Sequence, residues 1–407
     1  MSLYVTHPTL DLTGTVSESL KGKKIALAVT GSIAAVETVK LSRELIRRGA
    51  EVQAVMSKAA QTIIHPYALQ YATGRVPITE ITGDVEHVAY CGKRREAYDL
   101  LLISPCTANT IGKIASGIDD TPVTTFATTA IGSKIPTLII PAMHGSMYDH
   151  RIVQENIRKL EDIGVRFLTP RFEEHIAKIP DNAEIVLNTE RMLSDSPLRG
   201  KKILITSGPN FEEIDPIRVL TSRSTGRMGM ELALEAFRLG ADVTLVHKDK
   251  LGVQGIRDVF AESAAAMTDT VIKELKSGYD IFISAAAISD FTVEKTRENK
   301  ISSAGPVTIT LKPTPKLIDL ARYEFPVLFI VAFKADTVKE EELVERAMDR
   351  LDESGVNMIV ANRFGGPRDP EVNDVFIIRH DEPVIRHGGK KSAVASAILS
   401  AVSEYFR

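Results

Sequence analysis

A turn rich in glycine and hydroxyl groups follows the first apolar run of the chain. Thr30-Gly31-Ser32-Ile33-Ala34 connects the apolar residues Ile25–Val29 to a segment whose apolar groups have near-helical spacing. Backbone amides at the start of a helix attract anions, and glycine lets a phosphate come close to the backbone. The turn has neither the dinucleotide fingerprint nor the Walker pattern. Taken alone, the turn is weak evidence for a phosphate site, because such turns only cap a helix about as often as they bind an anion.

Two later segments of the first half also combine small, hydroxyl and imidazole groups. Ser104–Thr110 follows a strand, and Ser116–Asp120 continues this region, so there is space and hydrogen-bonding capacity for a flat ligand. Pro141–Tyr148 follows the next strand and contains His144. With His87, it is one of the two histidines best placed for acid–base work, although a single histidine is more often structural.

The histidines of the first half do not form a zinc motif. The spacing of His65, His87, His144 and His150 matches no familiar arrangement of zinc ligands. We therefore predict no metal site made by the protein alone.

The second half has a long polar loop between a strand and a helix. Residues 206–218 lead into 220–229, where glycines and hydroxyls lie beside Arg223 and Arg227. Guanidinium groups in this setting suit a polyphosphate or a phosphorylated acid better than they suit a simple helix cap. Asp290 closes the next strand after several small residues, which allow close contact with a ligand.

Alternating strands and helices must position these segments. Ile25–Val29 and Val52–Met56 flank a helix, and Lys201–Thr206 begins a similar series that includes a helix over Arg227–Arg238. Repeated units of this kind build parallel sheets covered by helices on both faces. We predict an α/β fold with two doubly wound, Rossmann-like domains over residues 21–195 and 196–407, after an extension over 1–20. Ligands should bind at the carboxyl ends of the strands, where strand order reverses.

The motifs of the first half resemble the flavoprotein family of homo-oligomeric cysteine decarboxylases. The resemblance covers about residues 22–190 and rests on Val29–Ala35, Pro105–Thr110 and Pro141-Ala142-Met143, in this order. It implies that a flavin oxidises the substrate thiol, that carbon dioxide then leaves, and that the flavin returns the hydride. The resemblance also implies that the flavin is FMN and that it lies between protomers of a trimer. The residues implied to bind it are Gly31, Ser32, Ile33, Ser57, Ser104, Pro105, Thr107, Asn109 and Thr125.

His87 matches the active-site base of that family. His144 stands where bacterial members have an asparagine that holds the substrate carboxylate. The family's clamp-loop cysteine is missing near 173–178, and we expect His144, His175 or Lys178 to replace it.

The motifs of the second half resemble the phosphopantothenate–cysteine ligase family over about residues 200–404. The resemblance implies activation of a carboxylate by CTP with Mg²⁺, formation of an acyl-cytidylate, and attack by the cysteine amine. Lys300 would offset charge on the phosphates. Ser222 replaces a usual asparagine, and the lysine cluster at 300–303 is shorter than in bacterial members. The residues expected at the nucleotide and substrate are Gly208, Ser222, Arg223, Ser224, Gly226, Arg227, Asp290, Phe333, Lys334 and Asn362.

Together the two halves resemble the bifunctional coenzyme A biosynthesis proteins of bacteria and archaea. The expected substrates are 4′-phosphopantothenate, cysteine and CTP, and trimeric and dimeric contacts would together give a homododecamer. A net charge of −3 shows no bulk attraction to nucleic acid, and no apolar run is long enough to cross a membrane. We therefore expect a cytoplasmic enzyme without nucleic-acid or membrane partners.

Two other functional classes were compared with this interpretation. An oxidoreductase with two dinucleotide domains is excluded, since neither half has a G-x-G-x-x-G motif followed by an acidic residue. A flavin- or nucleotide-binding regulatory protein that has lost catalysis stays open, because of the missing cysteine and the altered asparagine.

Overall fold

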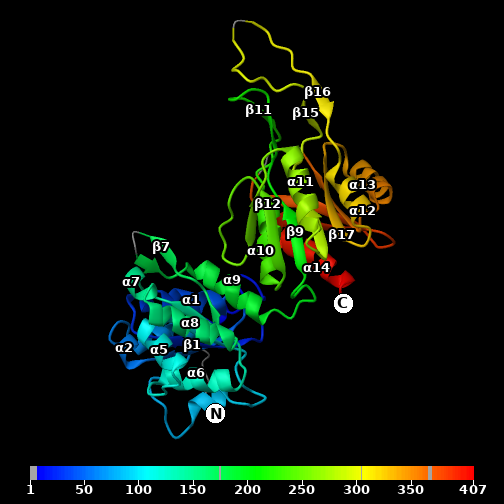
Figure 1. Ribbon diagram of the computed structural model, residues 1–407. Helices are drawn as coiled ribbons and strands as arrows, with labels where there is room; N and C mark the ends of the chain where they lie inside the picture. Colours follow the sequence, from blue (N-terminus) through cyan, green and yellow to red (C-terminus); the bar gives the residue numbers. More distant parts are fainter. Residues whose placement is uncertain (1–6, 174–175, 304, 365–368) are drawn as a thin grey trace. The chain divides into compact units, whose positions relative to one another are not determined.

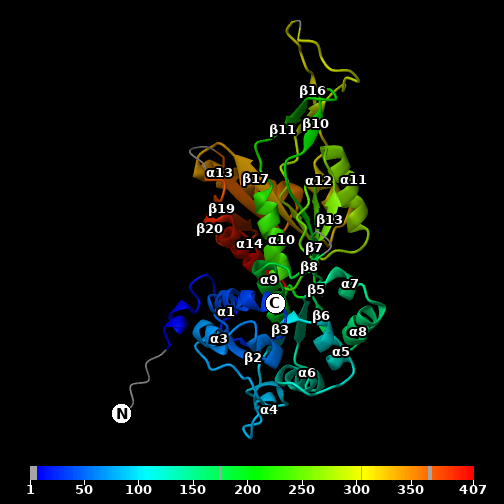
Figure 2. The ribbon, with the colours of Figure 1, turned by 90° about the vertical axis from the view of Figure 1, so that its left-hand side faces the viewer.

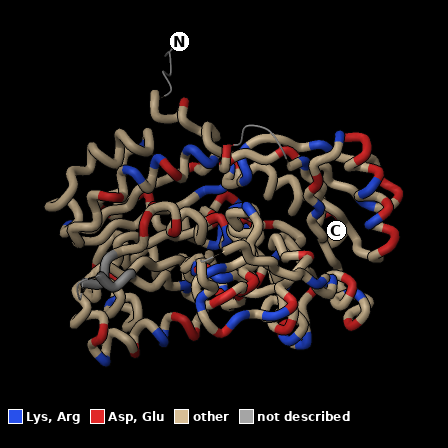
Figure 3. Tube along the Cα trace, turned by 90° about the horizontal axis from the view of Figure 1, so that it is seen from above, with Lys and Arg blue, Asp and Glu red and all other residues tan. Residues whose placement is uncertain are grey.

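The computed structural model describes residues 7–173, 176–303, 305–364 and 369–407 (Figure 1). The chain divides into two compact units, Met1–Leu193 and Ser194–Arg407. Both units combine helices with a mainly parallel sheet, which confirms the predicted fold class. Acidic and basic residues are interspersed along the described chain (Figure 3). Within the described ranges, no helix has the length and apolar character that a membrane span requires.

The first unit is built on a five-stranded parallel sheet with the strand order β2-β1-β3-β4-β6. Side chains alternate between its faces: Ile25, Leu27 and Val29 enter one core cluster, whereas Ala26 and Ala28 enter the other. The strands are β1 (Lys24–Val29), β2 (Glu51–Met56), β3 (Leu100–Cys106), β4 (Thr137–Pro141) and β6 (Arg166–Phe167).

Helices cover both faces of this sheet (Figure 2). One group is α1 (Thr38–Ile46), α3 (Pro66–Thr73) and α9 (Asn182–Leu193). The other is α4 (Glu86–Cys91), α5 (Ala108–Ala115), α6 (Pro122–Gly132) and α8 (Arg151–Asp162). Short elements lie between them: η1 (Pro8–Leu12), η2 (Ile33–Glu37), α2 (Lys58–Gln61) and α7 (Gly145–Tyr148).

Part of the segment that the sequence marks as an extension packs against the first unit. The hydroxyl of the buried Thr9 in η1 donates to the carbonyl oxygen of Tyr71 at 2.5 Å. Leu20 is fully buried in the core with β1 and α1. The described part of this segment therefore contributes to the hydrophobic core.

The second unit has an eight-stranded sheet with the order β13-β12-β9-β14-β17-β18-β19-β20. The first six strands of this order run parallel, and β19 and β20 pair antiparallel. The strands are β9 (Lys202–Thr206), β12 (Asp242–His247), β13 (Arg257–Phe260), β14 (Ile281–Ser284), β17 (Phe329–Asp336), β18 (Met358–Arg363), β19 (Val372–Arg379) and β20 (Ile385–Lys390).

Two groups of helices pack against this sheet. α10 (Arg227–Arg238) and α14 (Lys391–Tyr405) contact each other and the neighbouring strands. α11 (Ala264–Leu275), α12 (Leu317–Glu324) and α13 (Glu340–Ser354) contribute to a separate core cluster.

Two small antiparallel ribbons extend from one end of the second unit (Figure 1). The first pairs β10 (Phe211–Glu213) with β11 (Val219–Thr221), and the second pairs β15 (Phe291–Val293) with β16 (Leu311–Pro313). We call residues 211–221 and 291–313 the arm.

Candidate active sites

Each sheet has one point where the strand order reverses, and the predicted motifs lie there. In the first unit this point is between β1 and β3, and in the second it is between β9 and β14. The segments after these strands meet at the carboxyl edge of each parallel sheet, where open α/β sheets bind ligands.

The turn after β1 is fixed to the end of β3 by a set of hydrogen bonds. The amide and the hydroxyl of Thr30 both donate to the carbonyl oxygen of Pro105, at 3.2 and 2.8 Å. The amide of Thr107 donates to the Thr30 hydroxyl at 3.0 Å. The structure thus brings the two first-half motifs together.

This turn has the properties of a phosphate site. Ser32 caps η2, accepting a hydrogen bond from the Ala34 amide at 3.4 Å, and first-turn amides of a helix have no partner within it. Ile33 is 77% exposed, an unusual state for a large apolar side chain beside the turn. Ser57 lies after β2 and caps α2. A methyl group on Gly31 would come within 2.5 Å of Ala59 Cβ, so the close packing against α2 requires glycine.

The end of β3 offers a polar atom that the described chain does not satisfy. Ser104 is fully buried, and its hydroxyl oxygen has no hydrogen-bond partner among the described residues. Asn109 is exposed, while Thr125 on α6 donates its hydroxyl to Asp119 and to the Thr121 carbonyl oxygen. The turn suits the phosphate of a flavin. The exposed Ile33 side chain and the unsatisfied Ser104 hydroxyl suit its ring.

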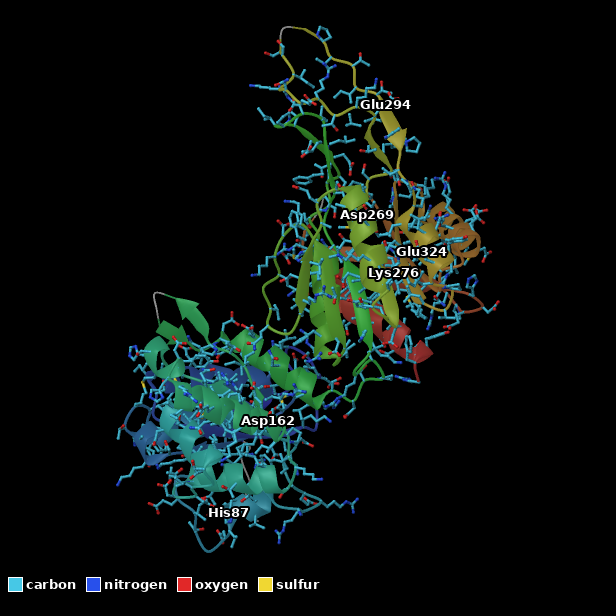
Figure 4. The ribbon with its side chains drawn as sticks, in the orientation of Figure 1. His87, Asp162, Asp269, Lys276, Glu294 and Glu324 are labelled. Carbon is cyan, nitrogen blue, oxygen red and sulfur yellow. The ribbon has the colours of Figure 1, made fainter. Side chains whose placement is uncertain are left out.

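His87 lies on α4, away from the hydrogen bonds of this turn (Figure 4). Its Nδ1 atom is buried without a hydrogen-bond partner among the described residues. The helix starts after Val85, whose φ of 53° is rare and strained for a β-branched residue. α4 packs against α6, and no hydrogen bond joins His87 to the turn or to Ser104–Asn109 in the described chain.

His144 lies in a small antiparallel sheet with the predicted clamp segment. β5 (Met143–His144) pairs with β8 (Ile176–Lys178), so that His144 is opposite Ile176, and β7 (Arg171–Glu173) completes the sheet. His144 is exposed. His175 lies outside the described residues.

The two cysteines of the chain are both buried in the first unit. Burial raises the pKa of the Cys91 thiol to about 12 and also raises the pKa of the Cys106 thiol. Neither thiol belongs to the 173–178 segment, so the clamp-loop cysteine has no counterpart there.

The second unit contains a pocket of about 1100 Å³ at its strand-order reversal. Two glycines approach each other closely beside it: a Cβ on Gly226, which has a φ of +72°, would lie 2.9 Å from Gly208 Cα. The Ser207 hydroxyl also donates to the Gly226 carbonyl oxygen at 2.7 Å. These contacts hold the start of α10 against the end of β9.

The pocket collects the predicted nucleotide and substrate residues from several loops. Those that line it are Ser222, Arg223, Ser224, Gly226, Arg227, Asp290, Phe333, Lys334 and Asn362. Gly208 is not among the lining residues, because it lies against Gly226 and supports the turn.

Lys300 also lies outside the pocket lining. It is exposed in the loop between β15 and β16. The neighbouring Ile301 amide donates to the Asp215 carboxylate at 3.0 Å, and Arg218 pairs with the same carboxylate. These hydrogen bonds, that of the Ile301 amide first, lower the pKa of Asp215. The loop is therefore tied to β10–β11 and not to the pocket edge.

Ion pairs engage two of the predicted ligand residues. Arg227 pairs with Glu371, and Asp290 pairs with Lys316. Sequence reasoning missed both partners. The sequence offered a signal for Lys316, since it follows Pro313-Thr314-Pro315 and directly precedes a helix. The residues around Glu371 give no indication of its pairing with Arg227. Other pocket residues that were not predicted include Thr314, Arg350, Arg363, Asn373, Asp374 and Lys391.

No three histidine, cysteine, aspartate or glutamate side chains converge to hold a metal ion in the described ranges.

Comparison with known families accounts for nearly the whole chain. Residues 13–194 match the family model described as "Flavoprotein". Residues 198–406 match the model described as "DNA/pantothenate metabolism flavoprotein C-terminal domain". The two models follow each other in the order of the two units.

Full-length relatives carry one common name. The coenzyme A biosynthesis bifunctional protein CoaBC of Thermococcus kodakarensis is 48% identical over 374 residues, 90% of this chain and 91% of the relative. The protein of the same name from Methanocaldococcus jannaschii is 37% identical over 411 residues, 98% of both chains. This chain belongs to the CoaBC family. It is a bifunctional enzyme of coenzyme A biosynthesis, with a flavoprotein decarboxylase half and a ligase half.

Solved structures align with one half each. The crystal structure of the C-terminal domain of a CoaBC protein is 32% identical and covers 52% of this chain and 98% of its own, with a TM-score of 0.44. The FMN-dependent cysteine decarboxylase SpaF is 29% identical and covers 41% of this chain and 94% of its own, with a TM-score of 0.37.

Proposed function

We propose that the second unit of this CoaBC family member joins cysteine to 4′-phosphopantothenate with CTP, and that the first unit decarboxylates the product to 4′-phosphopantetheine. The observation that carries this proposal is the pocket at the β9/β14 switch point. It gathers residues that the sequence singled out separately, from loops more than a hundred residues apart. We also propose residues 21–195 and 196–407 as the two functional domains, and the cytoplasm as the location.

In the ligase step, the substrate carboxylate attacks the α-phosphorus of CTP. This gives an acyl-cytidylate and pyrophosphate. The cysteine amine then attacks the acyl carbon, CMP leaves, and the amine loses a proton. Arg223 and Arg227 suit the phosphates because guanidinium groups form paired, charge-assisted hydrogen bonds. Mg²⁺, when bound with CTP, would offset negative charge on the phosphates and so ease the departure of pyrophosphate.

Ser222 and Lys300 differ in their position relative to the pocket. Ser222 lines the pocket, and a hydroxyl can donate one hydrogen bond to the acyl-cytidylate. Lys300 is our candidate for offsetting phosphate charge, but in this chain its loop is held at the arm by Asp215. Its contribution therefore requires a different position of the loop or a second chain.

In the decarboxylase step, FMN supplies a reversible hydride acceptor when it is bound. The Gly31-Ser32-Ile33 turn would hold its phosphate, while Ser104, Pro105, Thr107, Asn109 and Thr125 would surround the flavin. We assign His87 as the base, and His144 and His175 as the groups that hold the carboxylate or return a proton.

The position of His87 supports an oligomer. Within one chain it makes no hydrogen bond to the described turn residues, so a neighbouring chain would bring its base to the flavin. We propose a trimer for the first unit and a dimer for the second, which close together into a homododecamer.

Each half can be tested on the purified full chain. The proposed function predicts a yellow FMN spectrum, release of carbon dioxide from 4′-phosphopantothenoylcysteine, and pyrophosphate release that needs 4′-phosphopantothenate and CTP. Bound flavin without either turnover would instead support a regulatory protein. Three single variants, His144→Ala, His175→Ala and Lys178→Ala, test the clamp-loop assignment. Unchanged turnover in all three would reject it.

A further inference from the structure

Lys316 is a pocket cation that neither the sequence motifs nor the family resemblance assigns to any role. It immediately precedes α12 and lines the same pocket as Arg227 and Lys334. Its Nζ atom pairs with the carboxylate of Asp290, one of the proposed ligand residues. Both side chains are more than half exposed, at 53% for Lys316 and 65% for Asp290, so this pair faces the open pocket.

The backbone that carries Lys316 is fixed to the loop after β14. The amide of Thr314 donates to the Asp290 carbonyl oxygen at 3.0 Å, and its hydroxyl donates to the Ser289 carbonyl oxygen at 2.5 Å. Proline on both sides of Thr314 restricts the backbone further. Lys316 therefore belongs to the wall of the pocket, unlike Lys300, whose loop is tied to the arm.

Local stability does not explain a lysine at this position. Lys316 is the N-cap of α12 and makes no capping hydrogen bond with its side chain. N-caps favour Ser, Thr, Asp or Asn, and the helix dipole opposes a cation at a helix N-terminus. A cation placed against these preferences at a pocket wall is suited to a negatively charged ligand.

The proposed substrates are strongly negative, so that binding them requires cations in the pocket. A nucleoside triphosphate and a phosphorylated acid together bring several negative charges into one pocket. Arg227 already shares its guanidinium with Glu371, and the Lys316 ammonium pairs with Asp290. An incoming phosphate forms the same kind of charge-assisted hydrogen bond and carries up to two negative charges, so it can replace the exposed Asp290 carboxylate.

We propose that Lys316 is a substrate-binding residue of the ligase pocket, whose ammonium exchanges Asp290 for a phosphate oxygen of the bound substrate. This rests on the proposed ligase function. The phosphate belongs either to CTP or to 4′-phosphopantothenate, and separate titrations distinguish the two.

The test uses the full chain and the variants Lys316→Gln, Lys316→Arg and Lys312→Gln. Lys312 is a matched control, because it is an exposed lysine on β16 of the same segment but is not part of the pocket lining. Isothermal titration with Mg-CTP, and separately with 4′-phosphopantothenate, gives the two dissociation constants. We expect Lys316→Gln to weaken one of them about tenfold, a common size for a charge-assisted contact. Lys316→Arg and Lys312→Gln should stay within about threefold of the parent.

Ionic strength separates direct contact from an effect through Asp290. Salt screens the attraction between an ammonium and a phosphate, so the affinity of Lys316→Gln should depend less on salt than that of the parent. A salt dependence equal to that of the parent, with a loss reproduced by Asp290→Asn, would show that Lys316 only holds Asp290. Parent-like binding of both ligands by Lys316→Gln would also overturn the assignment. If the unsubstituted chain binds neither ligand and releases no pyrophosphate, the proposed function fails, and this assignment with it.

Discussion

At the scale of single residues, Arg227 is the proposed phosphate contact that a substitution tests most directly. It begins α10, lines the pocket, and is paired with Glu371. Replacing it leaves the Glu371 carboxylate to repel an incoming phosphate. The effect should therefore exceed the loss of one hydrogen bond.

We predict that Arg227→Gln weakens CTP binding by about 10- to 100-fold, as expected for loss of a charged hydrogen bond. The affinity of Arg227→Lys for CTP should lie between that of Arg227→Gln and that of the parent, because lysine keeps the charge but not the paired geometry. Titration with Mg-CTP measures both. Arg238→Gln, at the other end of the same helix and outside the pocket lining, is the control. Equal losses in Arg227→Gln and Arg238→Gln would show that the helix, and not the contact, is responsible.

Gly31 allows a similar test of the first unit. In Gly31→Ala the new methyl group meets Ala59 Cβ at 2.5 Å, so the turn must move away from α2. We predict loss of most of the bound flavin, read from the visible spectrum of the purified chain. Gly132→Ala on α6 meets no atom within 4 Å and should keep its flavin. Full flavin content in Gly31→Ala would remove this turn from the proposed site.

The sequence indicates residues whose signal is local and misses those that depend on a distant partner. Gly31, Arg223 and Asp290 stand out because glycines, hydroxyls or small residues surround them at the end of a strand. Glu371 becomes visible only through its pairing with Arg227, more than a hundred positions away. Lys300 illustrates the reverse: its type suits the chemistry, but hydrogen bonds to Asp215 hold its loop elsewhere.

At the scale of elements, a buried carboxylate joins the arm to the sheet domain. Glu212 on β10 is 5% exposed, and it accepts hydrogen bonds from the Ala264 amide at the start of α11 and from the Thr292 hydroxyl on β15. One side chain therefore connects three elements.

We predict that Glu212→Ala destabilises the second unit by about 1–3 kcal/mol, because it leaves the buried Ala264 amide and the half-buried Thr292 hydroxyl without their acceptor. Urea unfolding followed by circular dichroism measures this change. Glu213→Ala, at the exposed next position of the same strand, should change stability by less than about 0.5 kcal/mol. A similar effect of the two substitutions would contradict the role of Glu212 as an anchor.

The buried thiols on α4 and β3 predict how the first unit responds to alkaline pH. The pKa of Cys91 rises from 9.0 to about 12 on burial, and burial raises that of Cys106 as well. Above pH 9 the unfolded chain loses thiol protons that the folded chain keeps, so the free energy of unfolding decreases as pH rises. The loss is about 1.4 kcal/mol per thiol for each pH unit in this range.

Urea unfolding at pH 8 and pH 10 checks this expectation. A Cys91→Ala/Cys106→Ala variant is less stable at both values, since it creates cavities, but its loss between them should be smaller. An identical pH-dependent loss in the variant and the parent would assign the effect to other groups.

The parallel strands could be predicted because their apolar runs are short, continuous and followed by helices. The runs at β1, β9 and β14 are buried on both faces, which leaves a clear pattern in the sequence. β19 and β20 were not predicted, because their burial is only partial and they pair as an antiparallel hairpin at the edge of the sheet. The arm ribbons are three residues per strand, too short to show a period.

At the scale of the whole molecule, the chain divides into two compact units, and we propose one ligand site in each. We predict two calorimetric unfolding transitions. FMN should raise only one of them and Mg-CTP only the other, since a ligand at a hundred times its dissociation constant stabilises its own unit by about 2.7 kcal/mol. A single transition that both ligands shift would show instead that the units unfold together.

The most direct test of the bifunctional assignment follows one substrate through both units. The full chain with FMN is supplied with 4′-phosphopantothenate, cysteine, CTP and Mg²⁺, and its products are identified by mass spectrometry. We predict 4′-phosphopantetheine, with carbon dioxide, CMP and pyrophosphate formed in equal amounts. Intact CTP, or 4′-phosphopantothenoylcysteine that accumulates without losing carbon dioxide, would contradict the assignment.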